Sequence, residues 1–448
     1  MLVVLALGVS ACAPTTRLQV APGVLAAEWR DGPASGTVPL DAAWTAFGSP
    51  ELAALVARAM QANADIAVAS ARVIQARGQL GAARAASLPN LALSGTAGAA
   101  RGGDRQFNLA NQSVGLDIAY DVDLFGGLRA GQRAARARFE ASRFERDAVA
   151  LAIETDVARG YVRYAGIKAR IGLLGRALEN ARELDRIIGV RVREGVATKV
   201  DAGLQMIEVR RIEAETSRLV EARNRTRNAL AILVGEEAPQ FDAPTADLDA
   251  LSPPAFRTRQ PGELLTRRPD IRASEAQIAA ANCNVERARA AFLPGLRLSA
   301  GSLLDAGAAG PLMLGLSAGA SLLAPIFDGG RLKGNLMSAG GAQGEAVERY
   351  RKALLVALGE GEDALNAVEQ SRQRSALLAE TLTVARATAR LARRQYVEGA
   401  ADLQTLLDAE RSALDVEDAL AVATQERLEA AIDLYRALGG KPAQTGEM

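Results

Sequence analysis

SVGLDIAYDVDLFGG, residues 113–127, alternates apolar and acidic side chains from one residue to the next. A period of two is that of a β-strand with one apolar face and one acidic face. The segments on both sides of this stretch are rich in Ala and Arg and have a helical pattern. The strand therefore decides the fold, because its two faces need two different surroundings. The two parities are Val114, Leu116, Ile118, Tyr120, Val122 and Leu124 on one side, and Asp117, Asp121 and Asp123 on the other.

The sequence contains a long internal repeat. Residues 65–94 and 270–299, related by an offset of 270 − 65 = 205, share 13 identities in 30 positions without a gap. Later motifs repeat as well, since LFGG at 124–127 corresponds to IFDGG at 326–330. Such self-similarity indicates two tandem copies of one structural unit.

Each copy predicts the same order of elements, namely a helix, two strands, a very long helix and a last helix. Each long helix has about 65 residues and a length on the order of 95 Å, so it must pair with other helices along its length. We expect a first repeat over 51–235, a linker rich in proline over 236–261, a second repeat over 262–440 and a tail over 441–448. The expected helices are 51–86, 127–192, 198–234, 262–291, 330–396 and 402–438, and the expected strands are 88–98, 112–124, 293–302 and 312–325.

Composition argues against an enzyme and against nucleic-acid binding. The net charge is +1, and His is absent, which removes the commonest general base and the commonest metal ligand. The sequence has no nucleophile elbow, no phosphate-binding loop and no GxGxxG motif. We therefore expect no catalytic residue, no cofactor, no metal site and no nucleic-acid partner.

The N-terminus predicts export and lipidation. Residues 1–11 are mostly apolar and resemble the end of a secretory signal. Val9-Ser10-Ala11-Cys12 resembles a bacterial lipobox, so Cys12 would be lipidated and residues 12–50 would form a lipidated N-terminal segment. The alternative is an accidental cysteine after an apolar stretch.

The strands suit a membrane better than water. Segments of about 9 to 11 residues with one apolar and one polar face have the pattern of transmembrane strands. A sheet in a bilayer must close, and four strands are too few, since about eight are needed. The strands must then be pooled, with eight from two chains or twelve from three. The alternative is a pair of surface hairpins on a soluble helical protein.

Three motifs resemble the outer-membrane factors, the TolC-like conduits of Gram-negative efflux systems. The resemblance covers residues 40–440, and it is greatest to the lipoprotein branch that includes OprM and NodT. It implies a mainly α fold with membrane β: a homotrimer with a 12-stranded outer-membrane β-barrel continuous with a long periplasmic α-helical barrel. It also implies a periplasmic adaptor (membrane fusion) protein, an inner-membrane pump of the RND type and outer-membrane lipid as partners. The motifs are RRPDIRASEAQIAAANCNVERARAAFLPGLRLS, AYDVDLFGGLR and PIFDGGRLKGNL.

The resemblance places adaptor contacts at two helix-hairpin tips, REGVATKVD at 193–201 and YVEGAADLQTLLDAER at 396–411. Their glycines also suit tight turns on their own account, because glycine adopts a positive φ without strain. The implied adaptor-contact residues are Gly195, Val196, Ala197, Gly399, Ala400 and Ala401.

A periplasmic gate is implied just inside these tips. Three copies of Asp408 around one axis would repel one another and favour cations, while pairs with arginine would hold the helices closed. By spacing alone, Asp408 and Arg411 are equally well an ordinary i,i+3 surface pair. Gln404 stands where the OprM-like pattern has an apolar residue. The implied gate residues are Asp201, Tyr396, Asp408 and Arg411.

The strand of 113–127 then acquires two predicted surroundings. Leu116, Ile118 and Tyr120 should face lipid or a packed neighbour, and Asp117 should face a water-filled lumen. Glycines at the strand-to-helix junctions should let a membrane strand turn into a periplasmic helix. The junction residues are Phe125, Gly126, Gly127, Phe327, Asp328, Gly329 and Gly330.

The predicted function is that of the outer-membrane channel of a tripartite efflux system, a passive conduit for small molecules. The lipobox and the OprM-like motifs favour this function. Two alternatives stay open from the sequence: a conduit for type I protein secretion, and a lipid-anchored periplasmic scaffold without a channel.

Overall fold

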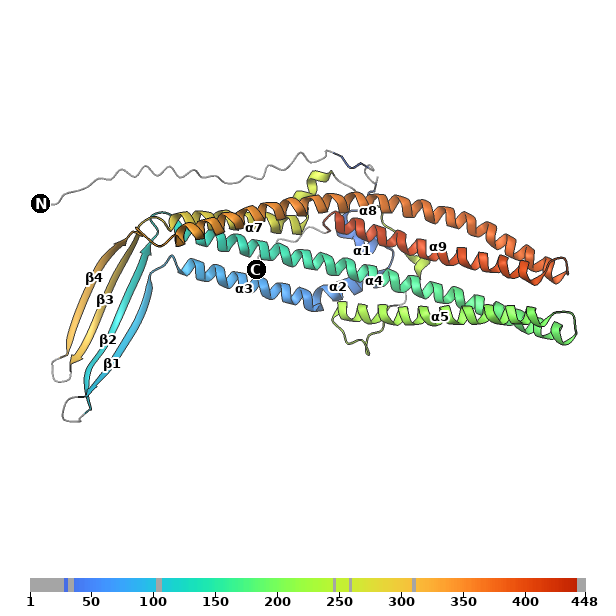
Figure 1. Cartoon of the computed structure of the whole chain (residues 1–448), viewed down its shortest axis with the longest axis horizontal. Coiled ribbons are helices and arrows are strands. Elements are labelled where there is room, and N and C mark those ends of the chain that lie inside the picture. Colours follow the sequence, from blue (N-terminus) through green and yellow to red (C-terminus); the bar gives the residue numbers. More distant parts are fainter. Residues whose placement is uncertain are drawn as a thin grey trace. The chain divides into compact units, whose positions relative to one another are not determined.

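A computed structural model describes residues 28–30, 36–101, 107–244, 247–257, 260–307 and 312–440 (Figure 1). The predicted signal, the lipidation site Cys12 and the tail 441–448 lie outside the described residues.

Both repeats have the same order of long helices and strands (Figure 1). The first repeat contains α2 (Pro50–Ala62), α3 (Ala64–Ala85), β1 (Asn90–Arg101), β2 (Phe107–Val122), α4 (Gly127–Arg193) and α5 (Lys199–Val234). The second contains α6 (Leu264–Arg267), α7 (Pro269–Ala290), β3 (Gly295–Gly307), β4 (Met313–Leu323), α8 (Arg331–Val397) and α9 (Leu403–Ala437). A short helix α1 (Ala43–Ala46) precedes them, and 3-10 turns occur at Leu40–Ala42, Leu248–Ala250 and Pro261–Glu263.

The single helices predicted over 51–86 and 262–291 are wrong, because each is interrupted. Asn63 leaves the helical conformation with ψ of 131° and separates α2 from α3. Its buried side chain accepts a hydrogen bond of 2.9 Å from the Asp65 amide, which caps the start of α3. Its amide group also donates to the carbonyl of Leu233 on α5 at 2.9 Å. Arg268, with ψ of 120°, interrupts the second segment in the same way.

Within the described part of the chain, no single helix has both the length and the apolar character needed to cross a membrane. The pair α2 and α3, bent by 41°, passes the same test only when the two helices are taken together.

The strands form one antiparallel sheet in the order β1-β2-β3-β4. The predicted faces are present, since Ile118 lies opposite Leu91 and Ala300, whereas Asp117 lies opposite Ala92 and Gly301. β1 and β3 run past the predicted ends at 98 and 302, and β2 begins at Phe107, because the backbone pairing between the strands continues beyond the segments of clear alternation.

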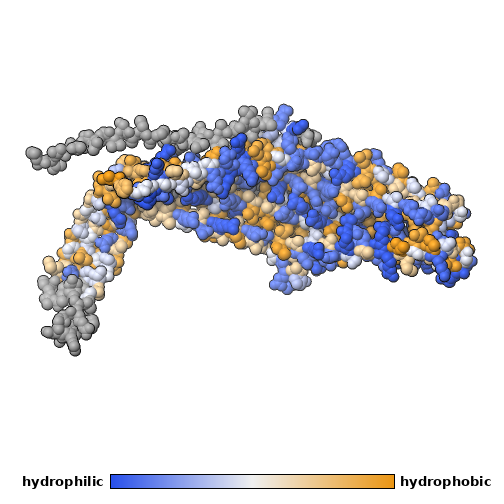
Figure 2. All heavy atoms as spheres, viewed as in Figure 1, coloured by the Kyte–Doolittle hydropathy of each residue, from blue (hydrophilic) through white to orange (hydrophobic). Residues whose placement is uncertain are grey.

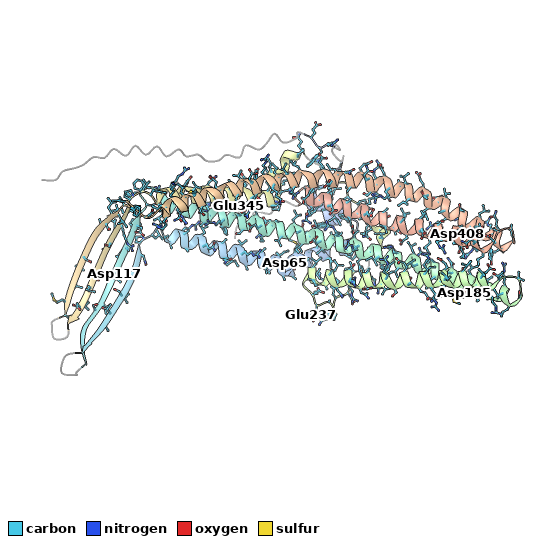
Figure 3. The ribbon with its side chains drawn as sticks, viewed as in Figure 1. Asp65, Asp117, Asp185, Glu237, Glu345 and Asp408 are labelled. Carbon is cyan, nitrogen blue, oxygen red and sulfur yellow. The ribbon has the colours of Figure 1, made fainter. Side chains whose placement is uncertain are left out.

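The acidic side of the sheet is hydrogen-bonded. Ser94 donates to Asp117 at 2.9 Å, and a β-carbon on Gly301 would lie 3.0 Å from the other oxygen of that carboxylate (Figure 3). The apolar side is bare, with Ile118 43% exposed and Leu93 75% exposed. In Figure 2 the visible face of the strands is mostly pale and orange, whereas blue residues are frequent over the helices. A sheet with such a bare apolar face needs an apolar environment.

Two compact units divide the described chain, and both take segments from both repeats. The first contains the sheet with the adjoining helix ends, residues 76–140 and 274–350. The second contains residues 28–75, 141–273 and 351–440, and so includes α5, α9 and most of α4 and α8.

The core of the second unit is assembled from small and aliphatic side chains. One cluster near the ends of the long helices brings together all four of α4, α5, α8 and α9. Neighbouring helices approach closely, since a β-carbon on Gly160 of α4 would lie 2.8 Å from the Leu230 side chain of α5. The buried members of that cluster are Leu184, Ile188, Ala392, Leu403, Leu406 and Leu407, with Val192, Ala202, Leu204, Tyr396 and Ala409 packed against them.

Candidate functional site

The two hairpin tips are built as the same turn. Gly195 and Gly399 both have φ of +76°, the left-handed conformation that glycine adopts without strain. The next amide closes each turn, from Val196 to the Arg191 carbonyl and from Ala400 to the Gln395 carbonyl, both at 2.8 Å. This bonding satisfies helix-end carbonyls and ends α4 and α8 in the same way.

The tips present small or apolar residues to solvent. Val196 is 72% exposed, and nothing lies within 4 Å of the place where a β-carbon on Gly195 or Gly399 would be. The Ala197 and Ala401 amides turn back to the same carbonyls as their neighbours, each at 3.2 Å. A partner backbone can therefore approach the tips closely.

The returning helices are capped by acids. Thr198 and Asp201 form a reciprocal capping box at the start of α5, in which the Thr198 amide donates to the Asp201 carboxylate at 2.8 Å. Asp402 accepts from the Thr405 amide at 2.8 Å and caps α9. The structure thus places the predicted gate residue Asp201 in a helix cap.

Tyr396, another predicted gate residue, joins the two hairpins. It is half-buried against the cluster near the tips. The Arg191 guanidinium of the first hairpin lies over its ring at 5.0 Å from the centroid. Such a cation–π contact stabilises the approach of α4 and α8.

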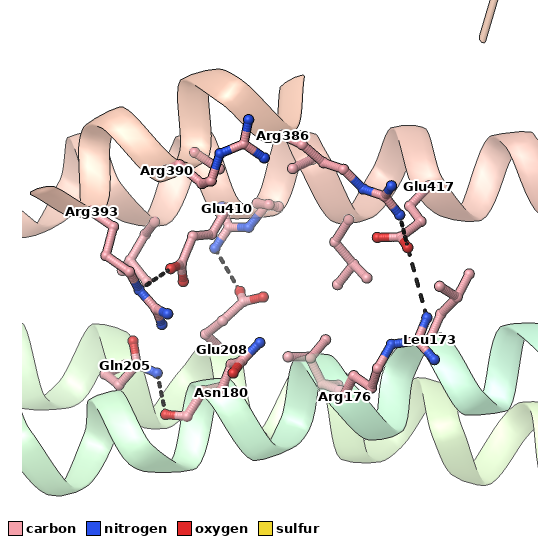
Figure 4. Close-up of a pocket in the computed structure, with 18 residues that line it drawn as sticks. Leu173, Arg176, Asn180, Gln205, Glu208, Arg386, Arg390, Arg393, Glu410 and Glu417 are labelled. Carbon is pink, nitrogen blue, oxygen red and sulfur yellow. Dashed lines mark hydrogen bonds and ion pairs between the residues drawn. The ribbon is translucent and has the colours of Figure 1, made fainter. Parts of the chain in front are cut away.

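Arg411 makes the polar contact between α9 and α5. Its Nη2 donates to Glu208 Oε2 at 2.8 Å, whereas its Nη1 lies 4.0 Å from Asp408 Oδ1. Both Arg411 and Glu208 line a groove between the two hairpins, which Figure 4 draws. The Glu208 side chain is 8% exposed and the Arg411 side chain 41% exposed. The closest carboxylate to the predicted gate arginine is therefore on the other hairpin.

Glu208 is held ionised between two arginines. Burial alone would raise the pKa of Glu208, but hydrogen bonds from Arg211 and Arg411 outweigh it and lower this pKa. Arg211 Nη2 lies 2.6 Å from Glu208 Oε1. The carboxylate therefore needs its cations, and losing one of them would leave a buried charge less well compensated.

Glu410 lies in the same groove, and its pKa is shifted upward, in the opposite direction to that of Glu208. Burial raises the pKa of Glu410, Arg393 opposes this effect at 3.2 Å, and the charge of Glu208 adds to it. The groove thus contains one carboxylate stabilised as an anion and a second carboxylate that binds a proton more readily.

The groove between the hairpins has a volume of about 340 Å³. Figure 4 shows carboxylates and arginines facing one another across it. Two of its buried polar atoms have no hydrogen-bond partner, namely Gln205 Oε1 and Arg411 Nε.

Asp408 lies on α9 near the tip (Figure 3) and is not buried. Both of its oxygens accept from Gln404 Nε2, each at 3.1 Å. Gln404, where an apolar residue was expected from the resemblance, thus holds the Asp408 carboxylate one helical turn away.

The strand-to-helix junctions lie in the other unit. Gly126 has φ of +77°, and Gly329 and Gly330 have +66° and +91°, whereas Gly127 is already the first residue of α4. Asp328 accepts from the Leu332 amide at 2.8 Å and so caps α8. Phe125 and Phe327 are 51% and 91% exposed beside the apolar strand ends.

Sequence reasoning did not single out Glu208, which the structure places at the contact between the two hairpins. A signal was present, because the buried positions Gln205, Glu208, Ile212 and Leu219 follow one stripe of α5. Two polar residues on an otherwise apolar stripe indicate a buried polar contact.

Over the described residues, no group of three or more acidic or cysteine side chains is arranged to hold a metal ion.

Three comparisons place the chain among known proteins. The sequence model of the family described as outer membrane efflux protein matches residues 55–236 and 261–440. The pyoverdine export outer membrane protein OpmQ of Pseudomonas aeruginosa is 33% identical over 412 residues, which cover 89% of this chain and 86% of OpmQ.

Solved structures share the fold. The outer-membrane channel OprN superposes with a TM-score of 0.84 at 28% identity, over 91% of this chain and 94% of OprN. The outer membrane protein VceC of Vibrio cholerae superposes with a TM-score of 0.81 at 27% identity, over 89% of this chain and 98% of VceC. The predicted fold, mainly helical with membrane strands and two tandem repeats, is confirmed.

Proposed function

Because this chain belongs to the outer membrane efflux protein family and is the outer-membrane channel of an efflux system, we propose that Arg411 keeps its periplasmic end closed. In this proposal three copies form one passive conduit. The observation that carries it is the bridge from Arg411 to Glu208 between the two hairpins.

Several copies of the chain are needed to close the sheet. Its four strands are paired in the order β1-β2-β3-β4, so within the described chain β1 and β4 are its two edges. An open edge is intolerable in lipid, and four strands cannot close on themselves. Three copies give twelve strands, the number that the resemblance implies. Cys12 would add a lipid anchor at the N-terminus.

Three-fold symmetry would multiply the contact that closes the channel. In a trimer every hairpin contact occurs three times around one axis. A partly exposed ion pair contributes about 1 kcal/mol, so three Arg411–Glu208 pairs shift the closed-to-open equilibrium by about 3 kcal/mol, or roughly 150-fold. Asp408, Asp201 and Tyr396 lie at the same end. The carboxylates of Asp408 and Asp201 add negative charge that favours cations.

The hairpin tips are where an adaptor protein would bind. Gly195, Val196, Gly399 and Ala400 offer exposed backbone and small side chains to an adaptor protein. The sequence has no nucleotide-binding motif, so an inner-membrane pump of the RND type would supply the energy. The relatives are named for export and efflux of small molecules, which favours a small-molecule cargo over a secreted protein. The chain itself would have no catalytic activity.

The test is single-channel conductance of the full-length protein in planar bilayers. We expect a small conductance for the wild type and a larger one for Arg411→Ala and for Glu208→Ala. Arg225→Ala is the matched control, because its ion pair with Glu221 lies within α5 and bridges nothing. Equal conductance in all four proteins would refute the gate, and no conductance in any of them would refute the conduit.

A further inference from the structure

A basic groove lies between α3 and α4, close to the strand ends (Figure 1 shows both helices beside β1 and β2). Four guanidinium groups line it, from Arg84 on α3 and from Arg129, Arg133 and Arg136 on α4. The hollow has a volume of about 520 Å³ and lies wholly within the unit that contains the sheet. Its other lining residues are Leu80, Gln132 and Gly126.

Only part of this positive charge is neutralised. Arg129 lies 3.1 Å from Asp123 and Arg133 lies 2.6 Å from Glu286, yet their side chains remain 67% and 51% exposed. Arg84 and Arg136 have no ion pair among the residues that the structure describes. Four cations and two carboxylates leave an excess of two positive charges in one groove.

The fold does not require this arginine set. α4 and α8 both have 67 residues and are related by an offset of 331 − 127 = 204. Lys333, Met337 and Gly340 therefore stand on α8 where Arg129, Arg133 and Arg136 stand on α4. The second repeat forms a helix of the same length with only one of these three charges, so α4 does not need the full set in order to form.

The neighbourhood of the groove is apolar. Leu88 and Leu91 follow α3 and are 63% and 61% exposed, and Leu124 and Phe125 precede α4 and are 49% and 51% exposed. In membrane proteins, exposed apolar side chains next to arginines typically lie at the level where the acyl chains of the bilayer meet the charged headgroups. Juxtamembrane clusters of basic residues attract anionic lipids.

We propose that this groove binds the phosphate of an anionic phospholipid in the periplasmic leaflet, with the acyl chains against β1 and β2. The planar guanidinium groups of Arg84 and Arg136 match the oxygens of a phosphodiester and are free to take them. The inference goes beyond transport, and it rests on the proposed orientation of the strands in the membrane but not on the gate.

The experiment counts phospholipids retained by the purified full-length protein in non-ionic detergent, by native mass spectrometry. The probes are dioleoyl phosphatidylglycerol and zwitterionic dioleoyl phosphatidylcholine, which have the same acyl chains. Arg84→Gln/Arg136→Gln removes the two unpaired charges. The matched control Arg72→Gln/Arg163→Gln removes two exposed charges from the same helices, also without ion pairs in the described chain, away from the groove.

The wild type and the control should prefer phosphatidylglycerol, and the groove variant should bind it roughly 30-fold more weakly, since each basic residue near an anionic surface changes affinity by roughly fivefold. Equal retention by both double variants would overturn the proposal, as would equal retention of both lipids or full displacement by inorganic phosphate. Conductance of the same variants is measured in parallel. Altered ion selectivity with unchanged lipid retention would place the arginines in the lumen and also overturn it.

Discussion

Arg411 of α9 lies 2.8 Å from Glu208 of α5, although 203 residues separate them in the chain. The same guanidinium lies 4.0 Å from Asp408 on its own helix. A strong contact between hairpins and a weak contact within one helix have different consequences. The first resists separation of the hairpins, whereas the second persists unchanged when they separate.

The two contacts can be told apart by a double-mutant cycle on conductance. Glu208→Gln and Arg411→Gln should each enlarge the conducting fraction, and the double variant should do little more, because both single changes remove the same bridge. Asp408→Asn combined with Arg411→Gln should instead show nearly additive effects. Additive behaviour of the Glu208 pair would contradict a bridge between the hairpins.

Asp201 and Asp408 should respond differently to replacement by alanine. Asp201→Ala removes half of a capping box and should destabilise the start of α5 by about 1 kcal/mol. Amide hydrogen exchange at residues 199–202 measures this loss. Asp408→Ala should leave exchange there unchanged and lower the preference for cations, because it removes an exposed negative charge near the tip. Fraying of α5 in the Asp408 variant instead would rule out this division of roles.

Gly195→Ala should destabilise its turn by about 1 kcal/mol, because φ of +76° is unfavourable for a residue with a β-carbon even though the space is empty. Gly203→Ala, on an exposed site of α5, is the matched control and should stabilise the helix by about 0.5–1 kcal/mol. Hydrogen exchange across the hairpin reports both. If both substitutions changed the stability of the hairpin in the same direction, the left-handed conformation of Gly195 would be contradicted.

Glu410→Gln should stabilise the protein increasingly as the pH rises above 4.5. The raised folded pKa of Glu410 means that the folded state binds more protons than the unfolded state in this window, so this group lowers wild-type stability as the pH rises. Thermal unfolding at pH 5 and pH 8 measures the difference.

Glu369→Gln is the control, because the folded state lowers the pKa of Glu369, whereas it raises the pKa of Glu410. Hydrogen bonds from Arg372 and Gln373 lower the pKa of Glu369 to about 2, so its ionised form adds stability that is lost only as the pH falls toward that value. The variant should therefore be less stable at both pH 5 and pH 8 by a similar amount. A stability gain for Glu410→Gln that shrinks with rising pH would contradict a raised pKa of Glu410 in the folded protein.

Ile118→Asp should impair insertion into the outer membrane, because a charge on the lipid face of a membrane strand is destabilising, although an aspartate costs less than the roughly 2–4 kcal/mol of a lysine or arginine at the midplane. Asp117→Asn is the matched change on the other face and should alter conductance while leaving the trimer intact. Heat-modifiability on gels and single-channel recording measure the two effects. Normal assembly of Ile118→Asp would exclude lipid contact at this face.

The local features of the molecule could be predicted from the sequence. Alternation placed Ile118 and Asp117 on opposite faces of one strand, and glycine at 195 and 399 marked the hairpin turns. The break at Asn63 was missed, because its cap is completed by the carbonyl of Leu233, which lies far away in the chain.

The strand faces, the long helices and the tips could be read from side chains a few residues apart, and the two repeats from the match of residues 65–94 with 270–299. The carboxylate that Arg411 contacts and the arginines that line one groove became apparent only in the folded chain. Glu208 comes next to Arg411, and Arg84 next to Arg136, through the packing of separate helices. Such neighbours are fixed by the fit of whole helix faces, which no short sequence pattern encodes.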